Sequence, residues 1–120
     1  MKNFTKLIVI LLLSCLGSLA QAHTSLHSSK PADQQLLQNS PEDFALVFTG
    51  KTRLVDLTLF DENANLIDFG FEPRMSERVS FKTALASPLS PGVYVLKWTV
   101  LGEDGHRITG TILFGVDDQK

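Results

Sequence analysis

The feature that most constrains the fold is a period-two alternation of apolar residues, which recurs in short runs along the 120-residue chain. Such alternation places the apolar side chains on one face of an extended strand and leaves the other face polar. Turn-forming residues such as Asp61-Glu62-Asn63 separate the runs. The alternating sets are Phe44, Leu46 and Phe48; Val55, Leu57 and Leu59; Val79 and Phe81; Tyr94, Leu96, Trp98 and Val100; and Ile108, Gly110, Ile112, Phe114 and Val116.

About seven short strands with little helix predict an all-β domain, an antiparallel β-sandwich. Residues 23–29 can form a polar edge strand that ends before Pro31-Ala32-Asp33. The one plausible helical stretch is residues 33–38, with about one turn. Everything else in the second half of the chain is typical of strands and turns.

The segment Leu89–Tyr94 (LSPGVY) adds a second sign of a sandwich. It has the form of a tyrosine corner, in which a Tyr hydroxyl donates a hydrogen bond to the backbone upstream of it. Trp98 lies four residues further and in phase with Tyr94, so we expect it in the centre of the core.

The N-terminus has the features of a secretory signal. Lys2 and Lys6 precede the apolar run Leu7–Leu13, and Ala20-Gln21-Ala22 is a cleavage pattern. We therefore expect residues 1–22 to be a cleaved signal peptide and residues 23–120 to be one exported domain. Leu12–Cys15 loosely resembles a lipoprotein cleavage site, which would instead give a lipidated Cys15.

Composition excludes several classes of protein. After loss of Lys2 and Lys6, nine basic residues stand against thirteen acidic ones, a formal charge of −4. No Lys/Arg cluster is present, so nucleic acid is not an expected partner. No later segment has the ~20 apolar residues that a membrane-spanning helix needs. Cys15 is the only cysteine, so a domain beginning at His23 has no disulfide.

The three histidines, His23, His27 and His106, are the candidate metal ligands. Once residue 23 is the N-terminus, its α-amine and its Nδ1 can bind one ion together. Asp104 and His106 are spaced i, i+2 around Gly105, which places both side chains on the same side of an extended segment. Three nitrogens and one carboxylate oxygen suit Cu(II).

Other interpretations remain for the same residues. Zinc accepts these donors in a tetrahedral arrangement. Asp104-Gly105 is also a favoured hairpin turn, which needs no metal. Without a thiolate, a blue-copper electron-transfer centre is excluded, and with Met75 as the only methionine after residue 22 a Met-rich Cu(I) site is not expected.

The sequence resembles the CopC family of periplasmic copper-resistance proteins over essentially all of residues 23–116. The motifs that carry the resemblance come in order: a mature N-terminal His, an S-x-P-A segment, a P-G-x-Y element and a D-G-H element. In this chain they are His23, Ser29–Ala32, Pro91–Tyr94 and Asp104–His106.

The resemblance implies a seven-stranded Greek-key β-sandwich or barrel, immunoglobulin-like or cupredoxin-like, that binds copper in the periplasm. It implies His23, Asp104 and His106 as ligands of one Cu(II) ion per chain. It also implies an inner-membrane partner similar to CopD, which would be a separate protein because this chain ends at Lys120 without membrane helices.

One position departs from some relatives. The third mature residue is Ser25 where those relatives have another His, which removes a separate square-planar copper motif. His27 lies two residues further and is a possible accessory ligand. In an extended strand, however, it would lie about 13 Å from His23, which favours a surface role.

The leading hypothesis is a non-enzymatic protein that carries, buffers or sequesters Cu(II) in copper homeostasis and resistance. One alternative is a copper oxygenase with an N-terminal His, for which Phe69 and Phe71 are the only candidates for a substrate-binding aromatic face. Another is a metal-free immunoglobulin-like interaction module, with Asp68–Arg78 as the segment that meets a partner. For the two phenylalanines of that segment, packing against the core is the favoured interpretation.

Overall fold

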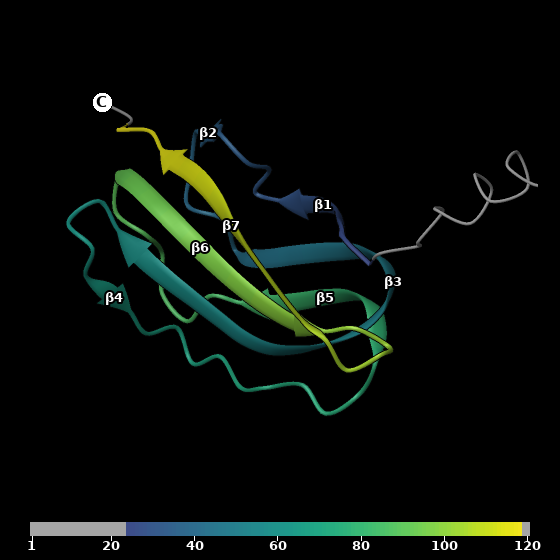
Figure 1. Ribbon diagram of the computed structural model, residues 1–120. Helices are drawn as coiled ribbons and strands as arrows, with labels where there is room; N and C mark the ends of the chain where they lie inside the picture. The colour runs from purple at the N-terminus through teal and green to yellow at the C-terminus, as the bar shows by residue number, and fades with distance from the viewer. Residues whose placement is uncertain (1–23, 119–120) are drawn as a thin grey trace, which may run out of the picture.

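The computed structural model describes residues 24–118, and all regular structure within them is β-strand. The all-β, seven-strand prediction is therefore confirmed. The strands are β1 (Leu26–Lys30), β2 (Gln35–Leu37), β3 (Asp43–Asp61), β4 (Leu66–Ile67), β5 (Arg78–Ala84), β6 (Gly92–Leu101) and β7 (Arg107–Val116) (Figure 1).

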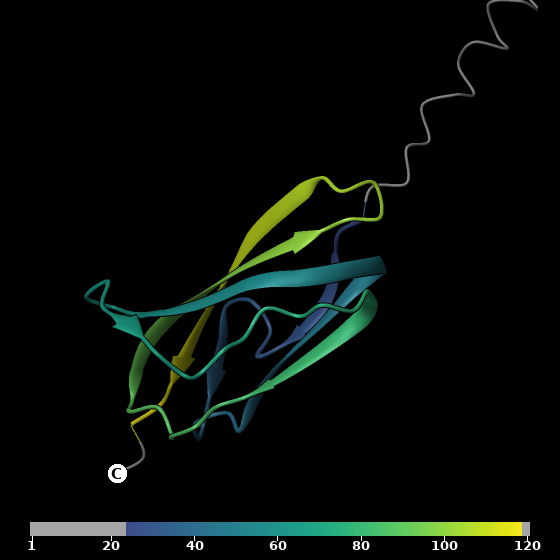
Figure 2. The same ribbon diagram turned by 90° about the horizontal axis from the view of Figure 1, so that it is seen from below.

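The long strand β3 organises the fold. Its first half pairs with β1 on one side and β5 on the other, and its second half pairs with β6. The order β1-β3-β6-β7-β2, with β4 and β5 also on β3, makes one continuous sheet that curls around a single core (Figures 1 and 2). Two strands expected from the sequence, around residues 44–48 and 55–59, are thus one strand that changes partners near Gly50.

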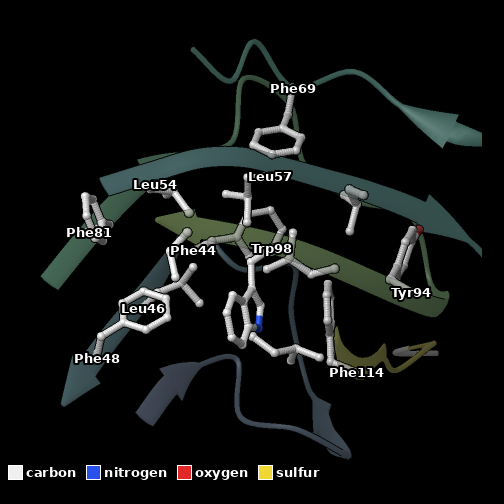
Figure 3. Close-up of a cluster of buried hydrophobic side chains, with 14 of the residues drawn as sticks. Phe44, Leu46, Phe48, Leu54, Leu57, Phe69, Phe81, Tyr94, Trp98 and Phe114 are labelled. Carbon is white, nitrogen blue, oxygen red and sulfur yellow. The ribbon is translucent and has the colours of Figure 1, made fainter. Parts of the chain in front are cut away.

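The core consists mainly of inward-facing residues from the alternating sets, although Val79 of the set Val79 and Phe81 is 42% exposed. Phe44, Leu46 and Phe48 are each 1% exposed. Figure 3 shows the aromatic rings gathered with these side chains, and Phe48 meets Trp98 edge-to-face at a centroid distance of 5.2 Å. Such pairs contribute about 0.5–1.5 kcal/mol beyond their buried area.

Two expectations about local structure are wrong. Residues 33–38 are not helical: β2 pairs in parallel with β7, and the Asp33 carboxylate accepts a hydrogen bond from the Leu113 N–H at 2.9 Å. The free edge of β7 therefore outweighs the weak helical tendency. Val55 is also only half-buried, because a register shift between Leu54 and Asp56 turns Leu54 inward in its place.

The tyrosine corner is confirmed, since the Tyr94 hydroxyl donates a hydrogen bond to the Ser90 carbonyl at 2.5 Å. Burial, helped by the charges of Asp61 and Glu62, raises the pKa of Tyr94, so the hydroxyl keeps the proton that it donates. This bond fixes the start of β6, the strand that leads to the 102–106 loop.

Trp98 is buried as expected, and its indole covers Gly110 on the neighbouring strand. A Cβ at Gly110 would lie 2.3 Å from Trp98 Cζ2. Gly110 alternates with the buried residues of β7, and its lack of a side chain leaves room for the Trp98 ring.

The connection between β4 and β5 closes one side of the curled sheet. Phe69 is 7% exposed and meets Phe44 edge-to-face at 5.5 Å, and Phe71 packs against the same core. Figure 3 shows Phe69 entering the cluster from this connection. The prediction that both phenylalanines belong to the core is confirmed.

Candidate metal centre

The candidate site is the five-residue loop 102–106 that joins β6 to β7. Leu101 pairs with Arg107 at the end of the ladder, and the Gly102 N–H donates to the His106 carbonyl at 2.9 Å. The Gly105 N–H donates to the Gly102 carbonyl at 2.9 Å, which closes a β-turn. Gly105 has φ +79°, a left-handed conformation that glycine adopts without steric cost.

The loop is not the two-residue hairpin turn that Asp104-Gly105 predicts. Between the paired residues Gly102 and His106, residues 103–105 form a three-residue hairpin loop, in which a β-turn is followed by a residue in the left-handed region. Gly105 fills that last position, and His106 is the first residue on the β7 side. The Asp104 side chain consequently faces His106 across the glycine.

Asp104 and His106 are in direct contact. Asp104 Oδ2 lies 2.7 Å from His106 Nδ1, and Asp104 Oδ1 accepts a hydrogen bond from the His106 backbone N–H at 3.1 Å. Both side chains face solvent, with 84% of His106 and 67% of Asp104 exposed. The i, i+2 spacing therefore does bring the two predicted ligands together, at a position that an ion from solution can reach.

Hydrogen bonding sets the charge of Asp104. The backbone N–H of His106, followed by its ring, lowers the pKa of Asp104 below the ordinary value for an aspartate. The carboxylate is therefore an anion throughout the neutral and mildly acidic range, and it offers a negative oxygen to a cation without first losing a proton.

The start of the described chain lies at the same end of the molecule as this loop. The Ser25 carbonyl accepts a hydrogen bond from the Thr49 N–H, and the Ser25 N–H donates to Thr49 Oγ1, both at 2.9 Å. Thr24 lies against Gly50, whose Cβ position would be 3.3 Å from Thr24 Oγ1. Figures 1 and 2 show the entry to β1 and the β6–β7 loop at the same end of the curled sheet.

Sequence reasoning did not identify this anchor. Thr49 is polar and follows the alternating run of β3, so nothing in the pattern marks it as the residue that binds Ser25. The contact between Ser25 and Thr49 becomes apparent only once β1 is known to pair with β3, because the Ser25–Thr49 hydrogen bonds continue that ladder.

His27 lies on β1, where a register shift between Leu26 and Ser28 leaves it as an extra residue of the strand. It is exposed. No group of three or more His, Cys, Asp or Glu side chains that could hold a metal ion occurs within residues 24–118. Within those residues, Asp104 and His106 form a pair of possible ligands without a third.

The remaining N-terminal predictions concern residues outside the described part of the chain. They are the metal ligand His23, the signal peptide 1–22 and the possible lipidation site Cys15. Within residues 24–118 no helix is both long and apolar enough to cross a bilayer.

Comparisons with known proteins place this geometry in a family. The CopC domain model matches residues 26–117. The crystal structure of CopC from Methylosinus trichosporium OB3b is similar, with 26% identity and a TM-score of 0.67, covering 82% of this chain and 97% of that one. No curated protein matches.

A second solved structure shares the fold. PcoC, a methionine-rich copper resistance protein from Escherichia coli, is 24% identical with a TM-score of 0.60, and the match covers 80% of this chain and all of PcoC. The family model covers β1 and the 102–106 loop, and it begins at Leu26, after residues 23–25. The chain belongs to the CopC family.

Proposed function

We propose that this protein binds one Cu(II) ion at the loop end of the sheet and carries, buffers or sequesters it in the periplasm. The proposed ligands are the α-amine and imidazole of His23, the carboxylate of Asp104 and the imidazole of His106. The observation that carries the proposal is the 2.7 Å contact between Asp104 and His106 on an exposed loop, at the end of the molecule where the described chain begins.

The Asp104–His106 contact orients the imidazole. His106 Nδ1 lies 2.7 Å from Asp104 Oδ2, a hydrogen-bond distance. When Nδ1 carries the proton of that bond, the lone pair of the neutral ring is on Nε2. We therefore propose that His106 offers Nε2 to the ion, while Asp104 orients the ring and offers a carboxylate oxygen.

Covalent geometry supports His23 as the missing donor. Consecutive Cα atoms are about 3.8 Å apart, so residue 23 stays next to Thr24, which lies against Gly50. Gly50 is three residues before Arg53, and Arg53 pairs with Leu101 at the start of the loop. Three strand residues span at most about 10 Å, so Thr24 lies near the end of β6, from which the loop with Asp104 and His106 continues.

The donor types favour the oxidised ion. Imidazole, amine and carboxylate suit Cu(II), whereas Cu(I) prefers thiolate and thioether sulfur. Met75 is the only methionine after residue 22, and it lies on the β4–β5 connection rather than beside the loop. We therefore propose no Met-rich Cu(I) site, in contrast to the methionine-rich PcoC.

We favour transport or buffering over catalysis. A copper oxygenase that attacks polysaccharides needs an open aromatic surface, and Phe69 and Phe71 pack on the core instead. The exposed Asp104–His106 pair suits an ion that must also leave, because a partner can approach it directly. Cleavage after Ala22, a domain of residues 23–120 and delivery to a CopD-like membrane protein belong to the same proposal.

The proposed role of the free α-amine of His23 can be tested by comparing two forms of the protein. Protein exported and cleaved to begin at His23, with its mass confirmed, is titrated with Cu(II) against a competing chelator. The same chain is then titrated with residues 20–22 retained and the α-amine acetylated. We expect one tightly bound ion in the first form and an affinity lower by on the order of 100-fold in the second, because the amine and its chelate ring are lost.

Equal affinities of the two forms would contradict the proposed ligand set. Thermal unfolding of both forms without copper is the control. Matching unfolding temperatures would show that a difference in affinity reports the site and not the stability of the fold.

A further inference from the structure

The outer face of the strands β1, β3 and β5, with the segment over it, gathers half of the Lys and Arg residues of the described chain. The chain has eleven Lys and Arg residues, and without Lys2, Lys6 and Lys120 the described part has eight, against thirteen Asp and Glu. Four of these eight lie on or over this one face. They are Lys30, Arg74, Arg78 and Lys82.

Strand register puts two of the lysines on either side of a small residue. Lys30 pairs with Ala45, and Ala45 pairs with Lys82, so the three side chains form one row across the sheet. Ala45 points away from the core, since its neighbours Phe44 and Leu46 are buried. The two ammonium groups therefore stand on the solvent side, on strands about 10 Å apart.

The segment that precedes β5 turns this face into a groove. Arg74 is tied down at two points: its backbone N–H donates to the Leu54 carbonyl at 2.8 Å, and its guanidinium donates to the Lys82 carbonyl at 3.2 Å. The groove between this segment and the sheet has a volume of about 530 Å³. Ala45 and Val47 are among its apolar lining residues, and Met75, 83% exposed, stands among them.

Carboxylates are nearly absent from the groove. None is among its lining residues: Asp43 forms an ion pair with Lys82 at 3.6 Å beside the groove, and Glu77 lies in sequence between the lining residues Ser76 and Arg78. Arg74 and Arg78 have no such partner among the ion pairs of residues 24–118. In a domain that is acidic overall, a concave surface with three cations and an apolar floor is complementary to an acidic chain.

We propose that this groove binds an extended, acidic segment of a partner protein, whose carboxylates meet Arg74, Arg78 and Lys82 while its small apolar side chains lie on Ala45 and Val47. A polypeptide fits the concave shape, whereas a flat lipid surface reaches only its rim. The groove uses none of the proposed copper ligands, so the inference stands apart from the copper site.

A labelled peptide tests the proposal directly. A fluorescent ten-residue peptide that alternates Glu and Ala is titrated with the mature protein in metal-free buffer at about 20 mM and then about 150 mM salt. We expect saturable binding that weakens as salt rises, and roughly tenfold weaker binding by the double variant Arg78→Glu, Lys82→Glu. A Gln/Ala peptide should not bind.

The matched control is the double variant Lys51→Glu, Lys97→Glu, which makes the same change in net charge at exposed lysines outside the groove. It should change peptide affinity by less than about twofold. Equal loss in both double variants, or equal binding of the Gln/Ala peptide, would overturn the proposal. So would binding to anionic vesicles without any binding of the acidic peptide. If the charge reversals unfold the domain, Arg78→Gln with Lys82→Gln replaces them and should also weaken binding.

Discussion

Replacing His106 with Ala should lower the Cu(II) affinity of the mature protein by on the order of 100-fold, since even groups that only support metal ligands change affinity by about 10–100-fold. The substitution removes one of three proposed nitrogen donors. It also leaves Asp104 Oδ2 without the ring that it contacts at 2.7 Å. Competition with a chelator of known affinity measures the loss.

The matched control is His27→Ala. Both histidines are exposed, and both substitutions remove one imidazole, but His27 lies on β1 outside the proposed ligand set. We expect its affinity for copper to change by less than about threefold, because a solvent-facing imidazole that is not a ligand adds little. Unfolding temperatures of both variants should match the parent, as surface substitutions usually change stability by less than about 0.5 kcal/mol. A larger loss for His27→Ala than for His106→Ala would reverse the assignment.

The largest effect on folding should come from Gly110→Ala. The new Cβ would lie 2.3 Å from Trp98 Cζ2 and 2.6 Å from Cε2, so the indole must move. Trp98 is 5% exposed and packed against Phe48, so the ring has little room to do so. Overpacking of this kind costs about 1–3 kcal/mol. For a domain of this size that lowers the unfolding temperature by roughly 5–20 °C, which calorimetry measures directly.

Gly115→Ala on the same strand is the comparison. Its Cβ would lie 3.0 Å from Leu36 Cδ1, the tip of a side chain that is 61% exposed and can turn away. The unfolding temperature should change by a few degrees at most. If Gly110→Ala were as stable as Gly115→Ala, the packing of Trp98 described here would be wrong.

The alternation of apolar residues predicted most of the fold because burial on one face of a strand depends on local spacing. The set Phe44, Leu46 and Phe48 is buried as predicted. The merging of two expected strands into β3 could not be predicted, because Thr49–Lys51 has the polar and glycine composition of a turn and yet continues the strand. Only its partners, β1 and β5 before that point and β6 after it, keep it extended.

The short strand β2 could not be predicted from the sequence either. Residues 35–37 have no strand pattern of their own, and their conformation depends on the open edge of β7. The inward position of Leu54 similarly depends on a register shift against β6. Both are consequences of contacts between residues far apart in the chain, which a single sequence does not display.

One part of the candidate site could likewise be predicted from the local sequence, and another part could not. The contact between Asp104 and His106 followed from their spacing around Gly105, a local property. The placement of Thr24 and Ser25 against Thr49 and Gly50 depends on the pairing of β1 with β3 and was not predicted. His23 stays a prediction that joins these two parts.

The proposed ligand set is best tested by pulsed EPR of the exported protein loaded with one equivalent of Cu(II). Remote imidazole nitrogens couple to the copper electron in a way that counts bound histidines. We expect two coupled imidazoles in the parent protein, His23 and His106, and one in His106→Ala. An unchanged spectrum in His106→Ala would contradict this ligand set and would mean that the 102–106 loop takes no part in binding copper.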